Sequence, residues 1–349
     1  MKKRSLLFLL GLSLITFSCT KDPIVTEPDL TPVEKPTKPN PNEPGEPGKP
    51  EEPEVPVTPN MGDYLIPAEY KDYYKGMDFT QEGMALKKQL AKLITKTHTP
   101  ISYTPGIWDA SEITDEDPDN PDNVIQIYGW ADKDAKQIHE KRSVPKIDKN
   151  NKSSKKPVTE LWEREHVFAK SLAVDKNKNQ ETLATNGYNG ELPKKIEEIA
   201  GHDAHNLRPI NRSRNSSRGN KKFVDAKGNS HAIGNYWYPG DEWKGDVARM
   251  MMYMHIRYEN ENGGGYTKAT KVGMPLNDKT GILSDEMIDL FLKWNAEDPV
   301  SPFEQKRNTY HGNKSNPGAQ GNRNPFIDNP ELANRIWGMK QYPGVNKWK

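Results

Sequence analysis

The chain has 349 residues, of which 28% are charged and 33% hydrophobic, and it carries a formal net charge of +1 at pH 7 with one cysteine. A single cysteine excludes a disulfide framework and a zinc site built from cysteines. The near-neutral charge permits binding to an anionic polymer but does not by itself argue for it.

Residues 1–19 have the composition of a secretory signal. Three basic residues lie within the first four positions, and the apolar run Leu6–Phe17 is shorter than the ~20 residues that a membrane-spanning helix needs. Cys19 directly follows this run, as in bacterial lipoproteins, whose cysteine is acylated after cleavage. Such sites usually have leucine three residues earlier, where this chain has Thr16. We expect export, with a lipid anchor at Cys19 that holds the protein at the outer membrane or cell surface; the alternative is a periplasmic or secreted protein.

Residues 20–60 are expected to form an extended linker. They repeat Pro, Glu, Lys and Thr without apolar periodicity, and such a composition cannot bury enough apolar surface to fold. Residues 1–19 contain three basic residues and no acidic one, and residues 20–60 contain five more acidic than basic residues, so that residues 61–349 carry +3. We expect this last part to be one folded, monomeric domain whose mildly basic charge suits an anionic substrate.

The first helix of this domain is expected to begin at Thr80, whose hydroxyl can cap it. Apolar residues then recur at the spacing of one helical face. They are Met84, Leu86, Leu90, Leu93 and Ile94. Further along the chain, Val124–Trp130 alternates as a strand, and the basic residues 140–157 predict a surface loop.

An acidic, proline-containing segment spans residues 111–123. Its carboxylates could bind calcium, but they lack the regular spacing of known calcium loops, so we favour a solvated turn. The carboxylates are Asp115, Glu116, Asp117, Asp119 and Asp122.

Three further helices are expected over Gly245–Tyr258, Ser284–Trp294 and Pro330–Trp337. The methionines of the first helix are expected to fill the core. Because helices alternate with short extended segments, the sequence predicts an α+β domain in which helices surround a small antiparallel sheet.

A strand over residues 162–168 carries the first candidate catalytic residues. In an ideal strand, Arg164 and His166 share one face, and Glu163 and Glu165 share the other. Glu165 and His166 can therefore meet at one substrate atom only if the strand ends or bulges there.

A short helix is expected after Asn211, a suitable N-cap, and before Gly219, which suits the left-handed residue that follows a helix. Asn211, Asn215 and Arg218 share one face, since they are four and three residues apart. An Asn oxygen, a Glu carboxylate and several waters suit Mg²⁺ or Ca²⁺. A neutral His can take a proton from water, and an Arg can neutralise phosphate charge.

Several separated motifs strengthen this interpretation. In chain order they are Trp162-Glu-Arg-Glu-His-Val-Phe168, Asp203-Ala-His-Asn-Leu-Arg-Pro209, Asn215-Ser-Ser-Arg-Gly-Asn-Lys-Lys-Phe223, Gly240-Asp-Glu-Trp-Lys-Gly-Asp-Val-Ala-Arg-Met-Met-Met-Tyr-Met254, Asp298-Pro-Val-Ser301 and Gln320-Gly-Asn-Arg-Asn-Pro-Phe-Ile-Asp328. Together they resemble the endonuclease I family of periplasmic and secreted bacterial nucleases over roughly residues 62–340. The resemblance implies the ββα-metal, or His-Me finger, core.

The resemblance also implies roles for individual residues. It implies that His166 is the general base for the attacking water. It implies that Glu165 and Asn215 bind a divalent metal, Mg²⁺ or else Ca²⁺ or Mn²⁺, and that Arg218 acts on the phosphate side. We expect supporting or phosphate-contacting roles for a further group. This group is Arg164, His205, Asn206, Asn211 and Asn220.

Two features depart from the family pattern. Glu163 stands where the family usually has asparagine, and residues 171–201 contain no arginine, although some members place a phosphate-contacting arginine there. Arg218 or a lysine of that segment could replace it. These lysines include Lys176, Lys178, Lys194 and Lys195. Further candidates for phosphate contact are Lys221, Lys222, Lys244 and Arg249.

The sequence therefore predicts an exported, metal-dependent nuclease of low sequence specificity that hydrolyses DNA, with RNA as a further candidate substrate. One alternative is a surface lipoprotein that binds nucleic acid or glycan without cleaving it. Another is a zinc hydrolase that uses His202 and His205. Because these histidines are three residues apart with no third ligand nearby in the sequence, we favour a hydrogen-bonding role for His205.

Overall fold

The computed structural model describes residues 62–151, 153–173, 192, 196–258 and 288–349. All described residues belong to one compact unit. The predicted signal, the predicted linker and the four lysines named for residues 171–201 lie outside the described residues.

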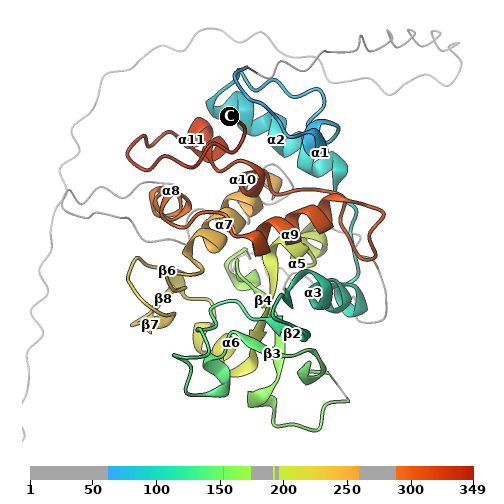
Figure 1. Cartoon of the computed structure of the whole chain (residues 1–349), viewed down its shortest axis with the longest axis vertical. Helices are drawn as coiled ribbons and strands as arrows, with labels where there is room; N and C mark the ends of the chain where they lie inside the picture. The colour runs from blue at the N-terminus through green and yellow to red at the C-terminus, as the bar shows by residue number, and fades with distance from the viewer. Residues whose placement is uncertain (1–61, 152, 174–191, 193–195, 259–287) are drawn as a thin grey trace, which may run out of the picture. The chain divides into compact units, whose positions relative to one another are not determined.

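Helices and strands alternate along the described ranges (Figure 1). The helices are α1 (Ala68–Lys71), α2 (Gly83–Thr97), α3 (Trp108–Thr114), α4 (Lys170–Ala173), α5 (Ile196–Gly201), α6 (Arg212–Arg218), α7 (Lys244–Tyr258), α8 (Ile288–Glu297), α9 (Pro302–Gly312), α10 (Pro325–Asp328) and α11 (Glu331–Trp337). Short helical turns are η1 (Tyr103–Ile107), η2 (Ile138–Glu140), η3 (Lys146–Asp148), η4 (Val158–Glu160) and η6 (Ala204–Asn206). None of the helices in the described ranges is long and apolar enough to cross a membrane.

The strands form three small sheets in the described part of the chain. They are β1 (Glu116–Asp117), β2 (Asn120–Ile125), β3 (Ser143–Pro145), β4 (Trp162–His166), β5 (Leu207–Asn211), β6 (Lys222–Phe223), β7 (His231–Ile233) and β8 (Tyr236–Tyr238). The sheet orders are β1-β2-β3, β4-β5 and β6-β8-β7. The α+β class is confirmed. Instead of one antiparallel sheet, the described residues form three small sheets, and β6 pairs with β8 in parallel.

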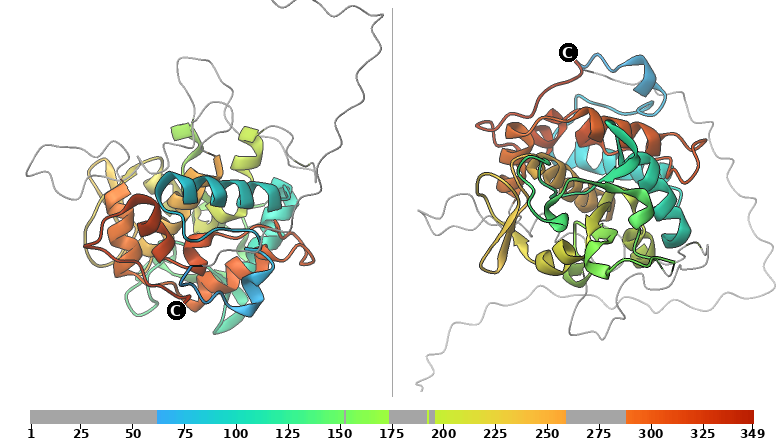
Figure 2. Two further views of the ribbon diagram at one scale, coloured as in Figure 1. Left: turned by 90° about the horizontal axis from the view of Figure 1, so that it is seen from above. Right: turned by 60° about the horizontal axis from the view of Figure 1, so that its bottom comes forward.

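Helix α7 lies at the centre of the core, with α2, α8 and α10 packed against it (Figures 1 and 2). Its residues from Gly245 to Tyr258 are all buried. The predicted core role of its methionines is confirmed, since each is at most 5% exposed. A helix that is buried on every side needs partners for its polar groups, and Arg249 obtains one from Glu304, at 2.7 Å from both carboxylate oxygens.

The predicted start of the first helix is wrong. Both the N–H and the hydroxyl of Thr80 donate to Asp78 Oδ1, at 3.0 and 2.6 Å, so Thr80 belongs to the preceding turn and α2 begins at Gly83. Met84 is 54% exposed and lies off the buried face. The buried face consists of Leu86, Leu90 and Ile94.

The predicted solvated turn at residues 111–123 is wrong for two of its carboxylates. Asp115 is fully buried, with Arg208 Nε at 2.7 Å and a second ion pair to Arg307. Asp117 is also buried and accepts a hydrogen bond from the Ser143 hydroxyl. These acids hold β1 and β2 against the rest of the domain instead of facing water.

Other element boundaries shift by a few residues. The predicted strand Val124–Trp130 ends at Ile125, because the chain turns where the N–H of Gly129 donates to Gln126 O. The predicted loop 140–157 contains β3 and η3. The three predicted C-terminal helices are confirmed as α7, α8 and α11, although residues 284–287 lie outside the described residues.

Candidate active site

The candidate site is built on strand β4, its partner strand β5 and helix α6, which directly follows β5; α4, α5 and η6 lie between the two strands in the chain (Figure 1). Strand β4 pairs residue for residue with the antiparallel β5, from Trp162 opposite Asn211 to His166 opposite Leu207. The pairing is regular through His166, so the strand does not bulge at Glu165 and His166; of the two conditions for bringing them together, only the end of β4 at His166 is met. This succession of elements agrees with the ββα order that the family resemblance implies.

Helix α6 begins and ends as its sequence predicts. The side-chain oxygen of Asn211 accepts hydrogen bonds from the N–H groups of Ser213 and Arg214, at 2.8 and 3.3 Å, which confirms the predicted N-cap. The helix ends at Gly219, whose φ of +54° is readily adopted only by glycine. These two residues fix where the helix lies relative to β4.

Two carboxylates of β4 face α6. Asn215 Nδ2 donates to Glu163 Oε1 at 2.6 Å, and Arg212 Nη1 donates to the same oxygen at 3.0 Å. Two residues further along the strand, Glu165 Oε1 lies 3.3 Å from Arg218 Nε. Because Asn215 and Arg218 are about one helical turn apart, α6 runs alongside β4 and places both residues against its acidic face.

Glu165 is a buried carboxylate whose polar partners lie at long hydrogen-bonding distances. It is 1% exposed, and the Tyr128 hydroxyl donates to it at 3.4 Å. Burial raises the pKa of Glu165 from 4.5 to about 7, although the Arg218 guanidinium acts in the opposite direction. That guanidinium also donates to the backbone oxygens of Val167 and Gly219. Arg218 is itself 1% exposed, so these contacts favour a supporting role over direct phosphate contact.

His166 leaves β4 from the opposite face. Its Nε2 lies 2.8 Å from the backbone oxygen of Gly201 at the end of α5, and its ring stacks on Tyr103 with centroids 5.8 Å apart. Burial, and then the positive charge of Lys170, hold the pKa of His166 well below its usual 6.5. Because a carbonyl oxygen only accepts, Nε2 carries the proton of a neutral ring and Nδ1 is the basic nitrogen.

Two cations lie close to His166. The guanidinium of Arg164 stacks on the rings of Tyr103 and Trp108, at 3.6 and 4.2 Å from their centroids, and also donates to the Tyr103 backbone oxygen. Lys170 Nζ lies 5.0 Å from the centroid of the Tyr103 ring. Burial lowers the pKa of Lys170 from 10.5 to about 8, and the charge of Arg164 acts in the same direction. A positively charged patch therefore borders the imidazole.

The remaining asparagines of the predicted site hold neighbouring segments together. The Asn206 carboxamide accepts from the N–H of Phe168 at 2.8 Å and donates to the oxygen of the same residue at 3.2 Å. Asn220 Nδ2 donates to the Ser171 hydroxyl at 3.2 Å, and Asn211 Nδ2 donates to a backbone oxygen of η4 at 3.0 Å. These contacts tie β5 and α6 to the chain on both sides of β4.

The two histidines of the zinc alternative point to different partners. His205 is buried, with Nε2 3.2 Å from the backbone oxygen of Asn322. His202 stacks on Tyr103, with ring centroids 5.2 Å apart. Among the described residues, no group of three or more His, Cys, Asp or Glu side chains is arranged to hold a metal ion. Within the described ranges the pair therefore has no third ligand of these types.

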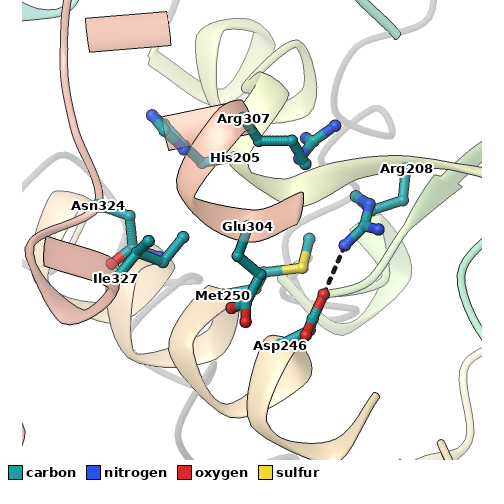
Figure 3. A pocket seen from close by; sticks show the side chains of 8 residues that line it. All are labelled: His205, Arg208, Asp246, Met250, Glu304, Arg307, Asn324 and Ile327. Atoms are coloured by element: carbon teal, nitrogen blue, oxygen red, sulfur yellow. Dashed lines mark hydrogen bonds and ion pairs between the residues drawn. The ribbon is translucent and has the colours of Figure 1, made fainter. Parts of the chain in front are cut away.

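A buried network of charges lies behind β5 and borders a cavity of about 20 Å³ (Figure 3). Arg208 on β5 donates to Asp246 Oδ2 at 3.0 Å, and Arg249 is paired with Glu304. Arg249 is 0% exposed, so its predicted contact with phosphate is wrong. The sequence pattern did not separate this structural arginine from a surface one, because its acidic partner lies on another helix.

Sequence reasoning missed Tyr103, Lys170 and Gly201 beside His166. Lys170 is only four residues from His166, so its place in the chain was a usable signal. Tyr103 and Gly201 come from distant segments and carry no motif. Only the packing of η1 and α5 against β4 reveals them.

Two oxygen-bearing groups between β4 and α6 suit a hard divalent cation. They are the carboxylate of Glu165 and the carboxamide of Asn215. A buried carboxylate whose nearest donors lie at 3.3 and 3.4 Å is poorly compensated, and a cation beside it would favour its ionised form. The residues present therefore fit Mg²⁺ or a similar ion.

Comparison with known proteins shows the family of this chain. The family model described as Endonuclease I matches residues 82–331. The chain belongs to the endonuclease I family.

Two relatives are both named extracellular ribonuclease. The one from Bacillus amyloliquefaciens is 39% identical over 280 residues, which cover 77% of this chain and 79% of the relative. The one from Bacillus subtilis (strain 168) is 37% identical over 280 residues, with 77% and 80% covered. Membership of the endonuclease I family identifies the chain as a nuclease, as the motifs predict.

Proposed function

We propose that this protein is an exported, metal-dependent nuclease that hydrolyses phosphodiester bonds in RNA and DNA with little sequence specificity. The observation that carries the proposal is the placement of two functional groups where β4 ends at His166, beyond which both would reach one phosphate. A neutral His166, fixed by a backbone carbonyl, lies on one face, and Glu165 lies with Asn215 and Arg218 on the other. The relatives' name, extracellular ribonuclease, supports export and supports RNA as a substrate.

In this proposal His166 is the general base. The Gly201 carbonyl fixes the ring and its tautomer, so that Nδ1 can accept a proton from the attacking water. The lowered pKa keeps the imidazole in its basic form at neutral pH. Tyr103 stacks against the ring and restricts its rotation.

Glu165 and Asn215 are the proposed protein ligands of a divalent metal, and Arg218 holds Glu165 in place. A bound divalent cation would neutralise charge on the phosphate and stabilise the leaving oxygen. Because α6 is capped at Asn211 and paired to β4 through its side chains, this donor set is largely formed in advance. The uncompensated burial of Glu165 is then a feature of an ion-binding group.

Lys170 and Arg164 are the proposed source of phosphate attraction near His166. Both cations lie against Tyr103, on the His166 side of β4. Contacts of this kind act on the backbone and carry no base information, which agrees with low sequence specificity. Lys170 can supply the charge that some family members obtain from an arginine in the loop after β4.

A cleavage assay tests the proposal. The full chain is incubated with supercoiled DNA and with RNA in Mg²⁺, with and without EDTA. We expect cleavage of both substrates that EDTA abolishes. His166→Ala should lose ~10²- to 10⁴-fold of turnover, the usual scale for a general base, while the fold survives.

The matched control is His231→Ala, since His231 is an exposed histidine on β7 whose Nδ1 lies 2.7 Å from the backbone oxygen of Asn229. It should cleave like the wild type. A His166→Ala protein as active as this control would refute the general-base assignment. Binding of nucleic acid without EDTA-sensitive cleavage would instead support the non-cleaving lipoprotein.

A further inference from the structure

Glu163 is held by three donors from two separate segments, the turn at Asn150 and helix α6. Asn150 Nδ2 donates to Oε2 at 3.0 Å, Arg212 Nη1 donates to Oε1 at 3.0 Å, and Asn215 Nδ2 donates to Oε1 at 2.6 Å. The Glu163 side chain is 14% exposed, whereas its ion-pair partner Arg212 is 50% exposed. Glu163 is therefore a fixed acceptor at the first turn of α6, and the shortest of its contacts goes to the proposed metal ligand.

The carboxamide of Asn215 can adopt two orientations that differ in which atom faces Glu163. An ionised carboxylate only accepts hydrogen bonds, so the orientation with Oδ1 toward Glu163 would oppose two oxygens without a proton between them. Glu163 thus selects the orientation in which Nδ2 faces it. The oxygen of Asn215 is then turned away from Glu163 and is available to a cation.

We propose that Glu163 is a positioning residue that orients Asn215 so that Oδ1, the only atom of its amide that can bind a metal, faces the ion. The inference rests on the proposed function, in which Asn215 binds the metal. Carboxylates that hydrogen-bond to a metal ligand commonly fix its orientation and raise metal affinity. Arg212 and Asn150 complete the arrangement, because they prevent Glu163 from turning toward the ion itself.

This role also accounts for the residue type at this position. An asparagine, which the resemblance leads one to expect here, can accept the same hydrogen bond through its side-chain oxygen. However, an asparagine can also turn its own amide group toward Asn215, whereas a carboxylate cannot. Glutamate therefore preserves the acceptor and removes the alternative orientation.

Direct metal binding tests the inference without relying on activity. Mn²⁺ affinity of the full chain is measured by titration calorimetry for the wild type and for Glu163→Ala, Glu163→Gln and Asn215→Ala. Glu163→Ala should weaken binding ~10- to 100-fold, the scale of losses for groups that orient metal ligands, and Glu163→Gln, which keeps an acceptor oxygen, should lose less than ~10-fold. Thermal unfolding should show that every variant is folded.

The matched control is Glu242→Ala, which removes a carboxylate that is 44% exposed and paired with Arg142. Its Mn²⁺ affinity should equal that of the wild type. The double variant Glu163→Ala/Asn215→Ala should bind Mn²⁺ no more weakly than Asn215→Ala alone, because Glu163 acts through Asn215. A further loss in the double variant would overturn the positioning role.

The remaining outcomes separate this inference from the function on which it rests. If Asn215→Ala loses affinity but Glu163→Ala does not, the inference fails and the proposed metal site stands. If Glu163→Gln loses as much as Glu163→Ala, Glu163 acts through its charge or binds the ion directly, and the inference also fails. If Asn215→Ala binds Mn²⁺ like the wild type, the proposed metal site fails as well.

Discussion

Replacing Glu165 by glutamine should stabilise the metal-free protein above neutral pH. Glutamine has nearly the shape of protonated glutamate but cannot ionise. In the folded protein Glu165 is 1% exposed, and burial outweighs the attraction of Arg218, so that its pKa rises from 4.5 to about 7. Ionising Glu165 in the folded state is therefore unfavourable.

The magnitude follows from the two pKa values. Below pH 4.5 the carboxyl is protonated in both the folded and the unfolded chain, and the variant gains nothing. Between 4.5 and about 7 the unfolded chain ionises while the folded chain keeps its proton, so the wild type loses stability as the pH rises. Above this range the difference levels off at about 3 kcal/mol in favour of glutamine.

The assay is urea unfolding of both proteins in EDTA at a series of pH values across this range. The free energy of unfolding of Glu165→Gln should exceed that of the wild type at alkaline pH, and the two should converge in acid. A variant that is less stable than the wild type at alkaline pH would refute the reasoning, because it would mean that Arg218 fully compensates the buried charge.

Repeating the unfolding experiment with Mn²⁺ in place of EDTA tests whether Glu165 binds the metal. A ligand that binds only the folded state stabilises it, so Mn²⁺ should raise the free energy of unfolding of the wild type. It should raise that of Glu165→Gln much less. The ionisable Glu165 would then lower the stability of the metal-free protein and, at the same time, allow it to bind the metal. An equal effect of Mn²⁺ on both proteins would remove Glu165 from the proposed ligand set.

Five further predictions address the network and the site. Arg208→Ala leaves two buried carboxylates without this partner and should lower the free energy of unfolding by about 3–5 kcal/mol, as measured in urea. Arg142→Ala breaks the exposed ion pair with Glu242 and should lower the free energy of unfolding by at most about 1 kcal/mol. A loss as large as that of Arg208→Ala would contradict the burial argument. Because the pKa of His166 lies below 6.5, kcat/KM should fall only at more acidic pH, and a fall centred above 6.5 in a pH–rate profile would argue against this base. Lys170→Met should raise KM for nucleic acid and reduce the salt dependence of binding by about one counterion, and an unchanged slope would exclude a phosphate contact. Asn211→Ala should cost about 1 kcal/mol in urea unfolding through loss of the α6 cap, and no change would mean that β5 alone positions the helix.

Local patterns were sufficient for the elements whose stability depends on nearby residues. Helix α6 begins after Asn211 and ends before Gly219, as predicted, because capping involves atoms within three or four residues. The methionines of α7 are buried as predicted. The prediction for Thr80 failed for an equally local reason, since its N–H and hydroxyl donate to Asp78, only two residues away, and hold Thr80 in the turn before α2.

Ion pairs between residues far apart in the chain could not be predicted from local sequence patterns. Asp115 belongs to an acidic segment that resembles a solvated turn, and its burial depends on Arg208 and Arg307, which are far away in the chain. Arg249 resembled a surface cation because Glu304 lies on a different helix. In both cases the charge is buried only because a partner from another element compensates it.

At the site itself, the sequence by itself determined the motif order, the family and the alternation of side chains along β4. It also predicted that Glu165 and His166 leave the strand on opposite faces, which follows from the two-residue period of any regular strand. The tertiary structure decided what each face meets. Gly201 and Tyr103 fix His166, and Asn215 contacts Glu163. Hydrogen-bond partners, burial and pKa depend on which distant segments pack together, and such packing is a property of the whole fold and not of any short stretch of sequence.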